Sequence, residues 1–569
     1  MGVFVILFTS LISATSVTIA EPVDGETYDG DWLTIRAIVE NENEAPDSVH
    51  YELNGSEAIL VLRLNTDWYT YMQNDLHHGY SESPAPTNNT VLWTAQVTGD
   101  FHEFPTPVVV DGIVYYPSNM GTDSLYALDA ASGDLLWKYL VGETDDAVTV
   151  KDGYLYTASD SLWCLDAITG ERIWATDYAN SGGSTPAVHG GCVYAGKNLG
   201  RPGTDLYTSQ VVSLDAYTGS VNWVISLPEG PAMLSCMTIW DDLLFVPTWS
   251  NGAEAFLYAL DASNGDIVWQ NNDSWEGYWD SSPVIVDSIL YISGWDGKTR
   301  GIDALTGLSI WEREISAGTY ISATPAYHDE RLYFADQVDT YHCLCAETGD
   351  PVWAVLGTQH GSSGIADGIV FYGEDFNSSG ARVFALDCET GAEVWSYTTG
   401  AGSIFSSPAI TDGVVYIAGN DWNLYAFGTG LKYTYLDDLF AEVGSNELIV
   451  TSYDGGTAVA ADTVNFTVTQ QGVTVDPANR LGLSVSPNPS RATASISFNL
   501  GGPSMTSVAI YDLAGRVVRV LGEATMSAGR HELIWDGRND TGERVSSGLY
   551  ICRISTPDAT ETTGVCLLR

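Results

Sequence analysis

Basic residues are scarce in this chain. Lys and Arg together number 22, against 73 Asp and Glu, so the 569 residues carry a formal net charge of −51. A surface this acidic repels nucleic acid and anionic lipid, which excludes both as partners. Two explanations of the charge stay open, a solvated acidic coat and a specific cationic ligand.

Cysteine is also rare, with eight residues and no C-x-x-C pair, which excludes a disulfide scaffold. Cys552 and Cys566 lie equally far from position 559 in a predicted terminal hairpin. If they oppose each other on two strands, a disulfide between them would stabilise the fold by about 2–4 kcal/mol. Two packed thiols are the alternative.

Signatures of common catalytic sites are missing. The chain contains no G-x-S-x-G, H-E-x-x-H or Walker sequence, so none of these active sites is predicted. His77 and His78 are adjacent, but no third metal ligand lies near them in sequence, which favours packing or turn chemistry over a metal site. The apolar run at residues 3–12 is typical of a signal peptide, predicted over 1–16, and no later stretch is expected to cross a membrane.

One stretch recurs throughout the centre of the chain. LYALDAASGDLLW (125–137) returns in six altered copies, each a strand, a tight turn and a second strand that ends in Trp. Two further strand signals around a D-G or D-S turn lie between the copies, as in SSPVIVDSILYISG (281–294). The period of about 40–45 residues is typical of one four-stranded propeller blade.

The two ends of the repeat region complete each other. Asn423–Gly428 is a third strand with no Trp strand after it, and Val91–Gln96 is a Trp strand with no blade before it. Joined, they make an eighth blade and remove free sheet edges. The predicted fold is all-β, an eight-bladed β-propeller over 88–430 with flanking immunoglobulin-like β-sandwich modules. The tryptophans expected to dock between neighbouring blades are Trp93, Trp137, Trp174, Trp223, Trp269, Trp311, Trp353 and Trp395.

The repeat resembles the tryptophan-docking motif, roughly A-x-D-x-x-T-G-x-x-x-W, of the pyrroloquinoline quinone (PQQ)-type β-propellers. The resemblance makes a PQQ-dependent oxidoreductase one possible function. In that family a vicinal Cys-Cys disulfide usually stacks on the quinone, and Glu, Asn and Asp hold a calcium ion beside it; neither set is matched here. The motif aspartates, such as Asp129 and Asp166, recur blade by blade, as structural residues do. We therefore predict no catalytic residue, cofactor or metal, and a non-catalytic binding or scaffolding role.

Irregular loops lead into the innermost strands and join the middle strands, and both groups crowd one face of the channel. Binding residues concentrate on such loops. Their aromatic and carboxylate groups suit sugars or cationic groups, so a protein or glycan partner is expected here. The alternative is that these aromatics only plug the funnel. The candidate ligand-binding residues are His102, Glu103, Asp145, Asp146, Trp275, Tyr278, Trp279, Asp280, Tyr320, His360 and Phe405.

The segments on either side of the propeller both alternate as β-sandwich strands do. Residues 17–66 resemble the first half of an immunoglobulin-like module, and residues 431–470 resemble its last strands. Either they form one sandwich with the propeller inserted, or they are two small modules. Residues 67–87 and 471–481 are predicted linkers.

Residues 482–569 predict a further sandwich. PNP at 487–489, YDLAGR at 511–516, WDGRNDTG at 535–542 and SGLY at 547–550 resemble the type A sorting domain of the type IX secretion system, which is related to the flagellar-hook-cap immunoglobulin-like fold. The resemblance implies a secreted or outer cell-surface protein that contacts the secretion machinery. A plain structural sandwich is the alternative.

Overall fold

The computed structural model describes most of residues 66–440, together with strands within 16–63, 444–469 and 484–567. Residues 1–15 of the predicted signal peptide lie outside the described residues. Within the described part, no helix has the length and hydrophobicity needed to cross a membrane. The chain divides into two compact units, Met1–Val468 and Thr469–Arg569.

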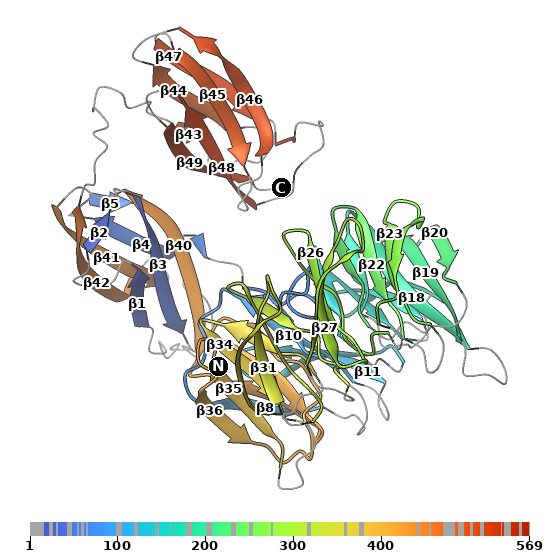
Figure 1. The fold of residues 1–569 in the computed structure, drawn as a ribbon. Helices are drawn as coiled ribbons and strands as arrows, with labels where there is room; N and C mark the ends of the chain where they lie inside the picture. The colour runs from blue at the N-terminus through green and yellow to red at the C-terminus, as the bar shows by residue number, and fades with distance from the viewer. Residues whose placement is uncertain are drawn as a thin grey trace, which may run out of the picture. The chain divides into compact units, whose positions relative to one another are not determined.

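Eight sheets, seven of four strands and one of five, form the centre of the first unit, which confirms the predicted propeller (Figure 1). Blades 1 to 4, innermost strand first, are β9 (Val108–Val110), β10 (Ile113–Ser118), β11 (Ser124–Asp129) and β12 (Leu135–Leu140); β13 (Thr149–Lys151), β14 (Tyr154–Ala158), β15 (Leu162–Asp166) and β16 (Arg172–Thr176); β17 (Ala187–His189), β18 (Cys192–Gly200), β19 (Tyr207–Asp215) and β20 (Val221–Ser226); and β21 (Thr238–Trp240), β22 (Leu243–Pro247), β23 (Leu257–Asp261) and β24 (Ile267–Asn271).

Blades 5 to 7 repeat this order, and blade 7 gains a fifth, parallel strand on its inner edge. They are β25 (Val284–Val286), β26 (Ile289–Ser293), β27 (Lys298–Asp303) and β28 (Ser309–Glu314); β29 (Ala326–His328), β30 (Arg331–Ala335), β31 (Thr340–Cys345) and β32 (Pro351–Leu356); and β33 (Gly364–Ala366), β34 (Ile369–Gly373), β35 (Arg382–Asp387) and β36 (Glu393–Thr398), with β7 (Tyr80–Ser81) beside β33.

Blade 8 is built from both ends of the repeat region. β37 (Ala409–Thr411), β38 (Val414–Gly419) and β39 (Asn423–Phe427) pair in order, and β8 (Val91–Gln96) adds the fourth strand. In that pair Ala426 lies opposite Trp93 and Asn423 opposite Gln96. The predicted closure of the ring is therefore confirmed.

Seven of the eight motif tryptophans bind the next blade in the same way. The indole N–H donates to the carbonyl oxygen of the residue that follows the third strand of that blade, as from Trp137 to Ala167 at 3.1 Å and from Trp311 to Ala346 at 3.0 Å. The indole ring of each of these tryptophans also packs against the motif glycine in the turn of that next blade. A Cβ on Gly170, whose φ is +70°, would stand 2.6 Å from Trp137, so a tight left-handed turn and a flat ring need glycine there.

The motif aspartates fix these turns. Asp215 Oδ1 accepts hydrogen bonds from the backbone N–H and the hydroxyl of Thr218, both at 2.8 Å. The hydroxyl bond and the backbone bond hold the pKa of Asp215 below its ordinary value. The recurrence of these aspartates thus has a structural cause.

The segments that flank the propeller share two sheets. One sheet has the order β1 (Ser16–Glu21), β3 (Trp32–Asn41), β40 (Leu431–Phe440), β6 (Leu62–Arg63), and the other β2 (Thr27–Asp29), β42 (Thr457–Thr469), β41 (Gly444–Asp454), β4 (Ser48–Leu53), β5 (Ser56–Ala58). Strands from before and after the propeller are neighbours in both sheets, since β3 pairs with β40 and β4 with β41.

The second unit consists of two sheets around Trp535, whose side chain is fully buried. The sheets are β43 (Ser484–Ser486), β44 (Ala494–Leu500), β47 (Gly529–Trp535), and β46 (Val517–Met526), β45 (Ser504–Tyr511), β48 (Gly548–Ser555), β49 (Thr560–Leu567). The indole N–H of Trp535 donates to the carbonyl oxygen of Arg538, 2.9 Å away, within the WDGRND turn.

The register of the terminal hairpin contradicts the predicted disulfide between Cys552 and Cys566. Cys552 lies opposite Thr563, and Cys566 lies opposite Leu549, so the two cysteines are three positions out of register. The reason is that the strand pairing is centred between positions 557 and 558 and not at position 559. Cys552 is a buried free thiol whose pKa is raised by burial to about 12.

Candidate functional site

A single segment, residues 66–83, lies across the inner strands of the propeller; we call it the strap. Trp68 and Val109 exchange two backbone hydrogen bonds of 2.8 Å, and the N–H of Ile365 donates to the carbonyl oxygen of Gly79 at 2.7 Å. Corresponding contacts reach every blade. The partners on the innermost strands are Val109, Val150, His189, Thr238, Ile285, Tyr327, Ile365 and Thr411.

Tyr71 connects the strap to the propeller through hydrogen bonds. Its hydroxyl donates to Thr324 Oγ1 at 3.1 Å and lies 2.8 Å from Ser362 Oγ. These two hydroxyls also accept hydrogen bonds from backbone N–H groups of neighbouring blades, Thr324 from Ser282 and Ser362 from Thr324, both at 2.8 Å. Tyr71 therefore joins a line of bonds that ties blade to blade.

The adjacent histidines anchor the strap. His77 Nδ1 lies 2.8 Å from Thr238 Oγ1 and 3.2 Å from the carbonyl oxygen of Pro283. His78 Nε2 lies 2.8 Å from the carbonyl oxygen of Ile285. Burial lowers the pKa of His77 to about 4 and lowers that of His78 as well, so both are neutral at pH 7. No group of metal-ligating side chains occurs among the described residues.

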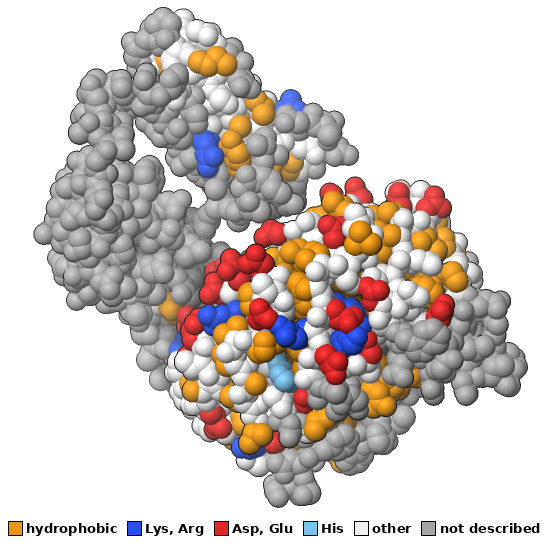
Figure 2. All heavy atoms as spheres, viewed as in Figure 1, with side chains coloured by type: hydrophobic (Ala, Val, Ile, Leu, Met, Phe, Trp, Pro, Cys, Tyr) orange, Lys and Arg blue, Asp and Glu red, His pale blue; other side chains and the backbone are white. Residues whose placement is uncertain are grey.

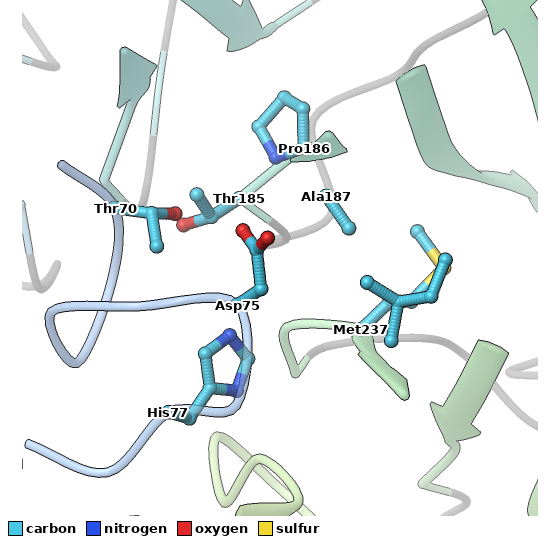
Figure 3. A pocket seen from close by; sticks show the side chains of 8 residues that line it. Thr70, Asp75, His77, Thr185, Pro186, Ala187 and Met237 are labelled. Atoms are coloured by element: carbon cyan, nitrogen blue, oxygen red, sulfur yellow. The ribbon is translucent and has the colours of Figure 1, made fainter. Parts of the chain in front are cut away.

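A small cavity lies between the strap and blades 3 and 4 (Figure 3). Figure 3 shows the Asp75 carboxylate and the hydroxyls of Thr70 and Thr185 directed into the same space. Lys151 Nζ lies 2.7 Å from Asp75 Oδ2. Burial alone would raise the pKa of Asp75, but the hydrogen bond of His189 and the charge of Lys151 lower it below its ordinary value.

This region does not fit a quinone. The cavity measures about 10 Å³, room for one water molecule, whereas pockets for organic cofactors are of order 300–1,000 Å³. The strap and Tyr71 contribute their own bonds where a planar ligand would need space. The chain also has no adjacent cysteine pair. No catalytic step through a quinone follows from these residues.

Four aromatic side chains gather on the loops above blades 4 to 6; we call them the aromatic cluster, namely Trp249, Trp279, Trp295 and Tyr320. Trp279 and Trp295 stack with centroids 4.8 Å apart and planes at 17°, and Trp295 and Tyr320 stack at 4.2 Å and 24°. Trp249 packs edge-on to Trp279 at 4.4 Å and to Trp295 at 5.5 Å. Tyr320 is 44% exposed, while the three tryptophans are partly buried.

Gly277 allows the loops that carry the cluster to come together. Gly277 has φ +80°, and its added Cβ would lie 2.2 Å from the carbonyl oxygen of Thr248, so only glycine allows the blade 4 and blade 5 loops to approach. Tyr278 N–H then donates to Thr248 O, and Trp295 N–H to Gly277 O, both at 3.0 Å.

Arg300 holds the turn that carries Trp295. Its side chain is fully buried, pairs with Asp296, and has Nε 3.0 Å from Glu312 Oε2. Burial alone would lower the pKa of Arg300, but the hydrogen bonds and charges of Asp296 and Glu312 raise it. Asp296 and Trp295 are thus fixed by a paired, buried charge.

The structure brings together part of the predicted ligand face. Trp279 and Tyr320 belong to the aromatic cluster, and Asp280 follows Trp279 in the same loop. The prediction that Tyr278 and Phe405 lie on the ligand face was wrong. Tyr278 is 0% exposed in the core of blades 4 and 5, and Phe405 is 4% exposed. The other candidates, His102, Glu103, Asp145, Asp146, Trp275 and His360, lie outside the described residues.

The sequence analysis missed Trp249 and Trp295. Both stand six residues after the first residue of the second strand of their blades, β22 and β26. Their equal position in two neighbouring repeats was the available signal.

The comparisons with known proteins cover both units. The family model PQQ_2, described as outer membrane protein assembly factor BamB, matches residues 85–152, 125–233, 158–323 and 354–463, more than half of the chain. The model of the FlgD Ig-like domain matches residues 485–559. The immunoglobulin-like character of the second unit is thereby shown.

Two curated proteins are similar to the propeller region. A tetrathionate hydrolase of Acidithiobacillus ferrooxidans is 24% identical over 365 residues, 56% of this chain and 70% of that protein. The outer membrane protein assembly factor BamB of Salmonella typhimurium is 23% identical over 365 residues, 59% of this chain and 88% of that protein.

Solved structures share the fold. A quinohemoprotein alcohol dehydrogenase from Comamonas testosteroni superposes with a TM-score of 0.54 and 15% identity, over 67% of this chain and 82% of its own. A europium-containing methanol dehydrogenase gives a TM-score of 0.53 and 14% identity, over 66% and 98%. At these identities the likeness concerns the propeller fold alone.

Proposed function

Because the chain belongs to the PQQ_2 family, described as outer membrane protein assembly factor BamB, we propose that it is a non-catalytic binding protein that works outside the cytoplasm. Its propeller is a rigid support, and its ligand face is the set of loops that carries the aromatic cluster. The BamB relative supports a protein partner over a small reacting substrate, and supports an extracytoplasmic location.

The observation that carries this proposal is the strap. It is hydrogen-bonded to the innermost strands of seven blades, lies 4.0 Å from His189 on that of blade 3, and puts Tyr71 among the blade-to-blade hydrogen bonds. The cavity beside the strap measures about 10 Å³, far less than an organic cofactor needs, so we place binding at the loop face.

The second unit is proposed as an export signal of the type IX kind, so the mature protein would be secreted or held at the outer cell surface. The FlgD Ig-like match over 485–559 and the four quoted motifs support this route. Deleting residues 470–569 tests it: the shortened protein should stay inside the cell envelope of its source bacterium while the intact protein leaves it. Export of both to the same extent would remove the proposal.

The alternative is a PQQ-dependent oxidoreductase, favoured by the two dehydrogenase folds and tested most simply by activity. The full chain is incubated with PQQ and Ca²⁺, and reduction of an electron-accepting dye is followed with short alcohols and sugars. We expect no quinone binding and no turnover, with a known PQQ dehydrogenase as the positive control. Quinone-dependent dye reduction would overturn the non-catalytic role.

A further inference from the structure

The repeat itself marks the aromatic cluster as an addition to the fold. The residue six positions after the start of the second strand is Asn, Asp or Gln in every blade except two. Blades 1 to 8 carry, in order, Asn119, Asp160, Asn198, Trp249, Trp295, Gln337, Asp375 and Asn420 at this position. Since six of the eight repeats carry an amide or a carboxylate at this position, the repeat does not require tryptophan there.

The indole N–H groups of these two tryptophans differ from those of the docking tryptophans. All eight docking indoles donate to a carbonyl oxygen of the following blade, at 2.9–3.1 Å. In contrast, Nε1 of Trp249 and of Trp295 are buried and find no acceptor among the described residues. Leaving a buried donor unpaired costs about 1–3 kcal/mol, so a fold gains nothing from two of them in one place.

The arrangement of the rings restricts the ligand. Parallel rings at 4.2 and 4.8 Å leave no room between them, so the cluster is a platform with Tyr320 at its exposed end and is no cage for a cation. The C–H face of a pyranose ring is apolar and packs flat on such a surface.

Charge restricts the ligand further. The chain has a net charge of −51, and Figure 2 shows Asp and Glu interspersed with hydrophobic side chains over the drawn face of the propeller. Asp280 and Asp296 follow Trp279 and Trp295 directly in sequence. An acidic polysaccharide would be repelled by this surface.

We propose that the aromatic cluster is the binding site for an uncharged polysaccharide, with one pyranose ring on the exposed face of Tyr320. This inference rests on the proposed binding function and names the ligand class of the same face. Trp279 and Trp295 hold the ring of Tyr320 flat from beneath, and the buried salt bridge of Arg300 with Asp296 and Glu312 holds the turn of Trp295.

The test is a calorimetric titration of the full chain with cellohexaose, chitohexaose and mannohexaose, with polygalacturonate and hexalysine as charged probes. Tyr320→Ala should weaken the binding of at least one neutral hexasaccharide by about tenfold or more, because the stacking surface is lost. Tyr320→Phe should keep the affinity within a few-fold. Tyr217→Ala is the matched control, since Tyr217 is 49% exposed on the motif turn of blade 3, away from the cluster.

The outcomes separate this inference from the proposed function. The melting temperature of Tyr320→Ala is the folding control. If it equals that of the wild type, a loss of affinity in this variant is not caused by a loss of the fold. The inference is overturned if no neutral hexasaccharide binds, if Tyr320→Ala binds as the wild type does, or if only polygalacturonate or hexalysine binds. Those results leave a non-catalytic binding role in place, whereas quinone-dependent turnover would remove that role.

Discussion

Trp395 donates a hydrogen bond from Nε1 to the carbonyl oxygen of Pro86, 2.9 Å away in space and 309 residues earlier in the chain. The other seven docking tryptophans donate to the residue after the third strand of the next blade, as Trp93 does to Ala130. Pro86 instead precedes β8, the strand that completes blade 8. The last docking bond of the ring therefore joins the two ends of the repeat region.

Loss of this bond should weaken the whole propeller. Trp395 is 7% exposed, and Trp395→Ala is expected to lower the free energy of unfolding by about 3–5 kcal/mol, since a large buried ring leaves a cavity. Urea unfolding followed by circular dichroism measures the change. Trp422→Ala is the control, because Trp422 is 44% exposed and should change stability by about 0.5 kcal/mol or less. Equal losses in both variants would show that Trp395 does not hold the ring.

The glycines of the motif turn make a second prediction. Gly391 and Gly368 have φ of +71° and +72°, so alanine is strained equally at both positions. A Cβ on Gly391 would lie 2.7 Å from Trp353, whereas a Cβ on Gly368 meets no atom within 4 Å. Gly391→Ala should therefore cost about 1–3 kcal/mol more than Gly368→Ala in the same unfolding experiment. Similar costs would mean that the indole ring does not rest on the glycine.

His77 makes stability depend on pH. Its pKa is about 4 in the folded protein and 6.5 in an ordinary environment. The unfolded chain therefore takes up the proton first as the pH falls. Stability is complete above pH 6.5 and declines toward pH 4, by roughly 3 kcal/mol for this group.

The measurement for His77 is the melting temperature between pH 7.5 and 5. His77→Asn should flatten its decline in this range, although His78, whose pKa is also lowered by burial, keeps part of the slope. Asp75 contributes only at lower pH, because its folded-state pKa lies below its ordinary value. Parallel curves for wild type and variant would contradict the assignment.

The register of the terminal hairpin predicts free thiols. Cys552 faces Thr563, so alkylation of the denatured, unreduced protein should label Cys552 completely. Peptide mapping by mass spectrometry reads the label directly. A peptide in which Cys552 is linked to Cys566 would show that β48 and β49 pair in another register.

The sequence predicts most of the propeller because its signals are periodic. The Trp-ended motif, the D-G turns and the incomplete repeats at Val91–Gln96 and Asn423–Gly428 together define eight blades and the way the ring closes. Each of these signals is local or repeated. The hairpin register could not be found in this way, because the pairing is centred between residues 557 and 558, and no repeated signal in the sequence marks that centre.

The strap and the aromatic cluster were harder to predict. The strap makes its bonds through single, non-repeated residues such as Tyr71 and His77, whose partners lie about 160–290 residues away and carry no common pattern. Tyr278 was misplaced because its loop, held by Gly277, turns the side chain into the core while Trp279 stays near the surface. Trp249 and Trp295 were visible only as exceptions to a polar turn position.

Hydrogen exchange of the strap tests the central claim, that residues 66–83 are firmly bonded across the inner strands of the propeller. In the full-length protein the amides of Trp68, His77 and Gly79 each donate to a backbone carbonyl oxygen. Peptides covering residues 66–83 should exchange as slowly as those covering β9 and β25, because the strap opens only when the propeller does. Exchange of the strap as fast as that of the exposed turn at Gly153 would show that the strap is not firmly bonded, and the argument for a binding protein would lose its basis.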